Sequence, residues 1–188
     1  EEAKKAVPLI ESFADLDEPK WTPPPPPERL ALEDICLDGG TQQRAQLTEE
    51  AVEEYAEALR QGRQLPPVVV FLDDTDVYPK WWLVDGFHRV EAHRRAGLTY
   101  IAVEVRSGTR RAAILASVGV NASHGVRRTN LDKRRAVLTL LQDEEWGLWP
   151  NRKIADLTGT TQQFVGKVRR ELADGVEASE ALAAYGAL

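Results

Sequence analysis

Between residues 30 and 107 the hydrophobic positions fall in short blocks separated by turn-forming residues. The blocks at 68–72 and 81–84 are rich in Val, Trp and Leu, which is typical of buried strands. Thr48 and Gly62 bracket a stretch with helical spacing, and Gly97 ends a second one. The pattern predicts that the globular part starts at 30–35, with helices at 48–60 and 87–96 and strands at 68–72, 81–84 and 100–105.

From residue 110 onward hydrophobic positions recur every three to four residues, which predicts helices at 110–120, 131–144, 151–157 and 161–173. Short mixed elements followed by helices indicate an α+β fold, in which a small mixed domain at 30–122 precedes an all-helical segment at 123–176. The run of prolines at 23–27 can only be extended. We therefore interpret 1–29 as a proline-rich tail or linker, a stiff spacer rather than a proline-recognition ligand, and 177–188 as a second tail.

Composition narrows the classes of protein that fit. The 188 residues, 43% of them hydrophobic, suffice for one ordinary domain with an appended module. The single cysteine, Cys36, excludes an internal disulfide framework and favours a reducing compartment. No segment approaches the run of about 20 apolar residues that spans a membrane. We expect a cytoplasmic protein with no membrane partner.

Charge is unevenly distributed along the chain. Residues 124–170 carry ten Lys and Arg against five Asp and Glu, a local charge of +5. Because the whole chain carries −6, the remainder carries −11. A basic module attached to an acidic domain points to nucleic acid at one end only.

The residues from Asp85 to Arg89 occupy the turn between a predicted strand and a predicted helix. The first N–H groups of a helix are unpaired and its dipole favours negative charge, so this position can bind a phosphate. Gly86 would allow close backbone approach, while His88 and Arg89 would supply donors. A solvated helix cap has the same pattern, and the turn alone leaves both interpretations open.

The segment from Asp85 to Gly97 resembles the signature shared by ParB proteins and sulfiredoxins. Upstream, Gln42-Gln43-Arg44 is similar to the Gln-Pro-Arg element of ParB domains, and downstream 121–136 resembles their second phosphate-binding motif. The resemblance covers residues 35–172 and implies a ParB/sulfiredoxin-like nucleotide-binding domain followed by a helix-turn-helix segment.

In ParB proteins these motifs hold the phosphates of CTP, and in sulfiredoxins those of ATP, so the resemblance implies CTP or ATP as cofactor. The residues implied in nucleotide binding are Gln42, Arg44, Gly86, His88, Arg89, Asn121, His124, Arg127 and Arg128. For the basic cluster at 124–128, a solvated turn or direct contact with DNA phosphate fits equally well.

Two positions depart from the family pattern. Phe87 stands where sulfiredoxins carry their nucleophilic cysteine, which excludes sulfiredoxin activity. Val120 stands where ParB proteins carry a carboxylate that helps to hold Mg²⁺, and valine cannot ligate a hard cation. The sequence therefore argues against bound Mg²⁺, and we predict no metal site.

Residues 152–170 have the spacing of a helix-turn-helix. The small Ala155 lets the second helix approach, and Gly159 can adopt the positive φ of the turn. The predicted DNA-binding residues are Thr161 as the N-cap, Gln162, Gln163 and Lys167 toward the major groove, and Arg169 and Arg170 toward the backbone. A structural helical hairpin is the alternative, but the basic charge favours double-stranded DNA.

The sequence thus predicts a nucleotide-responsive DNA-binding protein of the ParB-like type, acting as a homodimer in plasmid or chromosome partition or in transcription regulation. It would be nucleoid- or plasmid-associated. The alternatives are an NTPase or nuclease that uses the same phosphate pocket, and an interaction module that binds no ligand. We favour a protein that is not an enzyme, although a weak NTPase activity is compatible with the pocket.

Overall fold

The computed structural model describes residues 28–45, 47–120 and 128–175. Its sheet contains five strands, β1 (Arg29–Ala31), β2 (Ile35–Cys36), β3 (Val68–Asp73), β4 (Lys80–Asp85) and β5 (Tyr100–Ser107), in the order β1-β5-β3-β4-β2. β3 lies in the centre, antiparallel to β4 and parallel to β5. This central position explains why Val68 and Val70 on β3 are completely buried.

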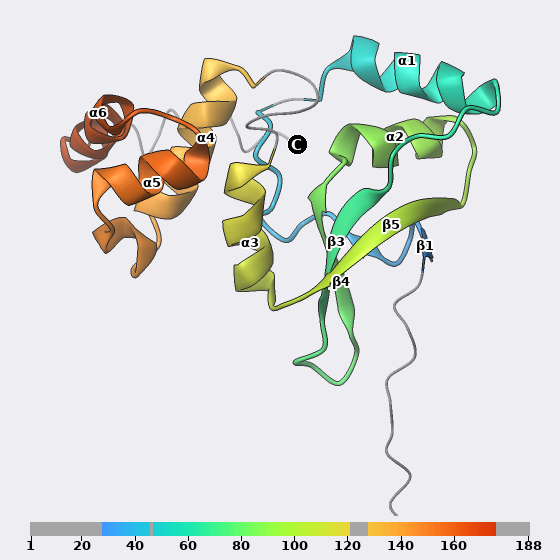
Figure 1. The fold of residues 1–188 in the computed structure, drawn as a ribbon, viewed down its shortest axis with the longest axis horizontal. Helices are drawn as coiled ribbons and strands as arrows, with labels where there is room; N and C mark the ends of the chain where they lie inside the picture. Colours follow the sequence, from blue (N-terminus) through green and yellow to red (C-terminus); the bar gives the residue numbers. More distant parts are fainter. Residues whose placement is uncertain (1–27, 46, 121–127, 176–188) are drawn as a thin grey trace, which may run out of the picture.

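The helix α2 (Phe87–Arg95) covers one side of the sheet, and α1 (Glu49–Arg60) lies on the outer side of α2 (Figure 1). α2 follows β4 after a single glycine and buries Val90 in the same core as Val68 and Leu83. α1 packs on α2 through a small apolar cluster of Val52, Ala56 and Ala92.

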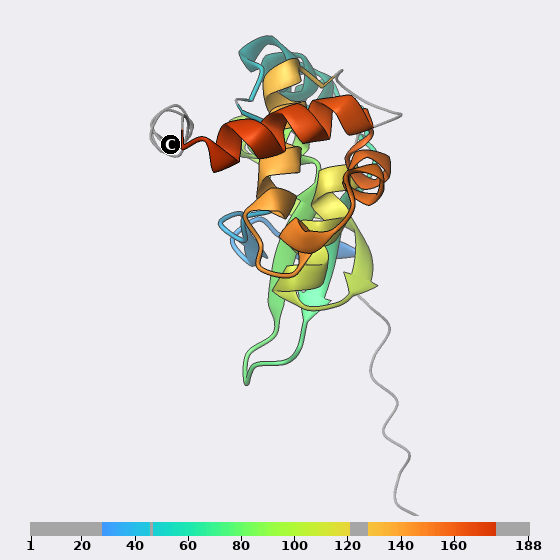
Figure 2. The same cartoon turned by 90° about the vertical axis from the view of Figure 1, so that its left-hand side faces the viewer.

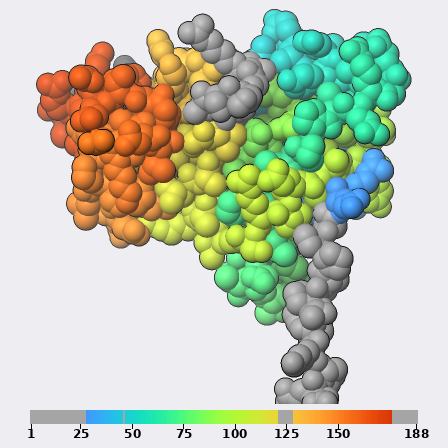
Figure 3. Space-filling view, viewed as in Figure 1, coloured from blue at the N-terminus to red at the C-terminus, as the bar shows by residue number. Residues whose placement is uncertain are grey.

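The helix α3 (Arg110–Gly119) has two apolar faces. One face places Ala113 against Phe71 and Trp82 of the sheet. The other places Val118, with Ile114 and Leu115, in the core of the C-terminal helices. The space-filling view shows the two parts meeting along this helix, drawn in yellow (Figure 3). The division that we predicted at 122/123 falls among residues outside the described ranges.

The C-terminal part consists of α4 (Asn130–Leu141), the short 3₁₀ helix η2 (Trp146–Leu148), α5 (Asn151–Thr158) and α6 (Gln162–Ala173). Its core is built from α4, α5 and α6, with Val137, Leu140, Ile154, Val165 and Val168 all completely buried. Figure 2 looks onto this part and shows α6, in red, on the outside.

The α+β prediction is confirmed, and the predicted helices and the three long strands are all present with ends shifted by a few residues. The short strands β1 and β2 and the helix η2 were not predicted. α4 ends at Leu141 rather than at 144 because the Asp143 carboxylate accepts hydrogen bonds from the backbone N–H groups of Glu145 and Trp146, which turns the chain into η2. In the part of the chain that the structure describes, no helix is long and apolar enough to cross a membrane.

Candidate functional site

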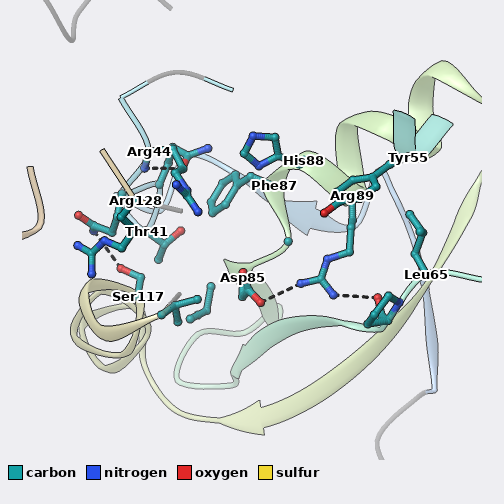
Figure 4. A pocket seen from close by; sticks show the side chains of 16 residues that line it. Thr41, Arg44, Tyr55, Leu65, Asp85, Phe87, His88, Arg89, Ser117 and Arg128 are labelled. Carbon is teal, nitrogen blue, oxygen red and sulfur yellow. Dashed lines mark hydrogen bonds and ion pairs between the residues drawn. The ribbon is translucent and has the colours of Figure 1, made fainter. Parts of the chain in front are cut away.

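The turn between β4 and α2 is built on Gly86. Its φ of 104° lies in the left-handed region, and a Cβ at this position would approach Cγ1 of Val68 to 2.4 Å. Only glycine therefore fits here. The first helical hydrogen bond of α2 runs from Val90 N to Gly86 O, so the preceding N–H groups have no partner within the helix. These groups lie at the centre of the site shown in Figure 4.

The guanidinium of Arg89, which was predicted to bind phosphate, donates hydrogen bonds to three protein oxygens. Nη2 donates to Oδ2 of Asp85 at 2.8 Å, and Nη1 donates to the carbonyl oxygens of Pro66 at 2.9 Å and Pro67 at 2.7 Å. The side chain is only 15% exposed. Its charge is therefore balanced by Asp85, and it fastens the β4–α2 turn to the loop before β3 (Figure 4).

His88, also predicted to bind phosphate, is buried beneath the start of α1. Its Nε2 accepts a hydrogen bond of 3.0 Å from the backbone N–H of Thr48, so the neutral ring carries its proton on Nδ1. Burial lowers the pKa of His88, and the nearby Arg44 charge lowers it further. The ring therefore positions the N-terminus of α1. His93 faces elsewhere and hydrogen-bonds through Nδ1 to the carbonyl of Arg89.

The segment 41–45 forms the opposite wall. Gln42 accepts a hydrogen bond from the backbone N–H of Arg44 at 2.9 Å, and the buried Gln43 donates to Oγ of Ser117 at 3.0 Å. The Arg44 side chain is 12% exposed, and its Nη1 lies 3.1 Å from Oδ2 of Asp132, near the start of α4.

Asp132 was not predicted as a site residue, but it connects this wall to α4. It accepts hydrogen bonds from the backbone N–H groups of Ala45 at 2.9 Å and Thr129 at 2.8 Å, and it completes a capping box with Thr129. Burial would raise the pKa of the Asp132 carboxyl, yet these hydrogen bonds and the Arg44 charge hold it below its usual value. Asp132 is thus ionised inside the protein.

Two buried polar atoms in the described ranges have no hydrogen-bond partner, Oγ1 of Thr41 and Nη2 of Arg128. Arg128 is anchored through Nη1, which donates to the carbonyls of Val118 at 3.2 Å and Thr158 at 3.0 Å. Burial lowers the pKa of Arg128, and the Arg44 charge adds to this effect. A buried donor without an acceptor costs about 1–3 kcal/mol, so both atoms indicate a site for a polar ligand.

Residues 41–44, the β4–α2 turn and the side chains of Ser117 and Arg128 all line one cavity of about 320 Å³. Figure 4 shows Thr41, Arg44, Ser117 and Arg128 at one end and Tyr55, Leu65 and Arg89 at the other, with Phe87 between them. The volume is in the range of small-molecule sites, which begins at about 300 Å³. The lining also includes Gln42, Gln43, Pro66, Val84, Asp85, Gly86, His88 and Val120. Of the described residues that line the cavity, Arg128 comes from the helical part, so a ligand here would touch both parts of the protein.

The residues that line the cavity fit an anionic ligand. The first N–H groups of α2, which have no partner within the helix, and the unsatisfied donors of Arg128 and Thr41 can donate hydrogen bonds to negatively charged oxygens. Among the lining residues within the described ranges, Asp85 is the one carboxylate, and it is paired with Arg89. In the described ranges no three His, Cys, Asp or Glu side chains are grouped so that they could hold a metal ion.

The second candidate surface is formed by α5 and α6. Gly159 adopts a φ of 60° in the turn, and Oγ1 of Thr161 caps α6 by accepting from Phe164 N at 3.2 Å. Val165 and Val168 are buried on one face of α6. The opposite face leaves exposed four of the predicted DNA-binding residues, Gln162, Gln163, Lys167 and Arg170.

Arg169, which was predicted to contact the DNA backbone, is partly buried and hydrogen-bonds within the protein. Nε donates to Oδ1 of Asn151 at 3.0 Å, Nη1 to the carbonyl of Gly147 at 2.6 Å, and Nη2 to the carbonyl of Trp149 at 2.8 Å. Each of the three nitrogens thus donates one hydrogen bond within the protein, and the side chain holds α6 to the η2 corner. Trp146 of η2 is buried in the core of the C-terminal helices.

Three predicted nucleotide-binding residues, Asn121, His124 and Arg127, lie outside the described residues. Conversely, sequence reasoning missed Thr41, Ser117 and Asp132. The pattern Thr129-x-x-Asp132 is a capping-box signal that could have located Asp132, but no local signal relates it to Arg44.

Comparison with known proteins places these observations in a family. Residues 28–122, half of the chain, match the ParB N-terminal domain. The chain is 32% identical over 130 residues to a possible regulatory protein of the streptomycin biosynthesis operon of Streptomyces griseus, covering 69% of this chain and 35% of that protein. It is 33% identical over 105 residues to the transcriptional regulator NovG of Streptomyces niveus, covering 56% of this chain and 30% of that regulator. The chain thus matches about a third of the length of these relatives.

A solved structure shares the fold. The C-terminally truncated chromosome-partitioning protein ParB of Caulobacter crescentus, complexed to the centromeric parS site, aligns with a TM-score of 0.54 and 21% identity, covering 82% of this chain and 78% of that one. This likeness extends beyond the sheet into the C-terminal helices. The match over residues 28–122, together with this fold, shows that the chain belongs to the ParB N-terminal domain family.

Proposed function

We propose that this protein is a nucleotide-responsive DNA-binding regulator of transcription. The observation that carries the proposal is the pair of unsatisfied buried atoms, Nη2 of Arg128 and Oγ1 of Thr41, in a cavity bounded by both parts of the protein. An anionic ligand bound there would contact the sheet domain and the start of the helical part together. The names of the two relatives support transcription over partition as the process served.

The ligand class that fits is a nucleoside triphosphate, with CTP and ATP as candidates. The N–H groups at the start of α2 and the Gly86 turn would contact its phosphates, and Gln42, Arg44 and Arg128 would complete the cradle. Val120 lines the cavity where a metal-holding carboxylate would stand, so binding does not depend on Mg²⁺.

The DNA-reading surface is the exposed face of α6. Gln162 and Gln163 suit adenine edges, and Lys167 suits guanine or phosphate. Arg170 contributes to backbone attraction. One such module buries too little surface for strong specificity, so the functional form is a dimer that reads two half-sites about 10 base pairs, or a multiple of that spacing, apart.

Two measurements test this function. Calorimetric titration of the chain with each of the four NTPs, with and without Mg²⁺, should show one ligand bound at millimolar concentration or below. Selection from random duplex DNA, with and without that ligand, should enrich a motif whose affinity depends on the ligand. If no NTP binds and no motif is enriched, the chain is an interaction module and the proposal fails.

A further inference from the structure

One face of α4 holds the pocket wall formed by residues 43–45. Asp132 accepts from Ala45 N and pairs with Arg44, Arg135 Nη1 donates to the Arg44 carbonyl at 3.2 Å, and Thr139 donates to Oε1 of Gln43 at 3.3 Å. Positions 132, 135 and 139 are spaced by three and four residues, so they lie along one side of the helix. Any rotation of α4 would therefore carry the pocket wall with it.

The Arg44 side chain contacts both the cavity and α4. Its side chain lines the cavity, and its Nη1 is paired with the buried carboxylate of Asp132. A phosphate in the cavity would be a second anion beside the same guanidinium, and charge-assisted hydrogen bonds of this kind are the strong ones. A ligand that attracts the Arg44 guanidinium into the cavity would weaken its ion pair with Asp132, and so the contact between Arg44 and α4.

α4 in turn contacts the DNA-reading helix. Arg134 on α4 and Glu171 on α6 form an ion pair of 2.6 Å, and both helices share the core around Val137 and Val168. The contacts thus run from the cavity through Arg44, Asp132 and α4 to α6.

We propose that Asp132 is a positioning residue that couples the pocket to the DNA-reading helix by competing with the ligand's phosphates for Arg44. This inference rests on the proposed nucleotide binding. When the pocket holds no ligand, Asp132 keeps the segment from Gln43 to Ala45 in contact with α4. Ligand binding then shifts the Arg44 side chain away from Asp132. Thermodynamic linkage is reciprocal: if bound nucleotide changes the affinity for DNA by a certain factor, bound DNA changes the affinity for nucleotide by the same factor.

The test is the substitution Asp132→Asn in the full chain. Asparagine keeps one acceptor oxygen, which can serve one of the two backbone N–H groups because Ala45 N donates to Oδ1 and Thr129 N to Oδ2, and it removes the negative charge that pairs with Arg44. Competition predicts that the variant binds CTP or ATP more tightly, by about 5-fold or more, and that nucleotide no longer changes its DNA affinity. A role confined to supporting the wall predicts the opposite sign, because a loosened wall would bind nucleotide more weakly.

Asp143→Asn is the matched control. Asp143 also accepts from two backbone N–H groups and pairs with an arginine, Arg111, but neither residue lines the cavity. This variant should lose stability without a change in nucleotide affinity or in its effect on DNA. A tightening equal to that of Asp132→Asn would show that the effect is general, and would overturn the proposal.

Arg44→Gln gives a second approach that does not require Asp132→Asn to fold. It should weaken nucleotide binding and abolish the effect of nucleotide on DNA, and adding Asp132→Asn to it should produce no further tightening. If the wild type binds no CTP or ATP, the proposed function and this inference fail together. If the wild type binds but Asp132→Asn binds equally or more weakly and stays nucleotide-responsive, only the role of Asp132 is refuted.

Discussion

The backbone N–H of Thr48 donates to Nε2 of His88, and this hydrogen bond joins the start of α1 to the first turn of α2. It requires a neutral imidazole, and burial lowers the pKa of His88 accordingly. Burial likewise lowers the pKa of His93, in part offset by its bond to the Arg89 carbonyl.

We therefore expect the protein to lose stability in mildly acidic solution. A group whose pKa is depressed in the folded state stabilises the fold above its unfolded pKa, here 6.5, and loses that contribution as the pH falls through the folded value. Urea unfolding at several pH values between 7.5 and 5 should show decreasing stability. The decrease should be smaller in His88→Gln, whose side-chain oxygen can still accept from Thr48. An equal decrease in both proteins would remove His88 as the cause.

Arg128→Ala should weaken nucleotide binding by about 10- to 150-fold, because a charge-assisted hydrogen bond contributes about 1.5–3 kcal/mol. Thr41→Val should weaken it less, and should leave the ligand-free protein as stable or more stable, because it removes a buried hydroxyl that has no partner. Calorimetric titration and thermal unfolding of both variants measure the two effects. Unchanged affinity in both variants would mean that the ligand does not reach this end of the cavity.

Gly86→Ala should destabilise the fold by about 2–4 kcal/mol, because the new Cβ meets Val68 in addition to adopting a left-handed φ. Gly97→Ala is the matched control, since Gly97 has a φ of 73° but nothing within 4 Å of the added atom. The Gly97→Ala variant should lose only about 1–2 kcal/mol of folding stability. Equal losses would show that the contact with Val68 relaxes without cost.

Arg170→Ala should weaken binding to all duplex sequences alike and reduce the salt dependence by about one ion, whereas Gln163→Ala should relax discrimination at one base pair by about 1–3 kcal/mol. Arg169→Ala should instead lower stability, because it removes hydrogen bonds to Asn151, Gly147 and Trp149. The affinity for duplex DNA, measured at several salt concentrations, distinguishes the effects of these three substitutions. A change in salt slope for Arg169→Ala, without a change in stability, would return that residue to the DNA surface.

Hydrolysis of the proposed nucleotide should be absent or much slower than about 1 per second, the low end of ordinary enzyme rates. The resemblance to ParB proteins implies a metal-holding carboxylate at position 120, and the valine there cannot ligate a hard cation. Phosphate release measured with Mg²⁺ and DNA present checks this expectation. Turnover at ordinary enzyme rates would identify the chain as an NTPase.

Local patterns in the sequence determined the elements and the positions of two special glycines. Short apolar runs bounded by turn residues located β3, β4 and β5, and helical periodicity located the six α-helices, because each signal depends on neighbours within a few residues. Gly86 and Gly159 were predicted at turns and adopt left-handed φ values there. The motif at 85–97 was also sufficient to indicate the family, since it is continuous in the chain.

Only the tertiary structure decided which partners the charged side chains take. Arg44 and Asp132 are 88 positions apart, and Gln43 and Ser117 are 74 apart, so no spacing rule relates them. Arg89 was predicted to bind phosphate and Arg169 to contact DNA. In the structure the Asp85 carboxylate and the Pro67 carbonyl hold Arg89 at the cavity wall, and the Gly147 carbonyl holds Arg169 against the η2 corner. An arginine has several donors and pairs with whichever acceptors packing brings into reach, and most acceptors of these two arginines lie 18 to 23 positions away in the chain.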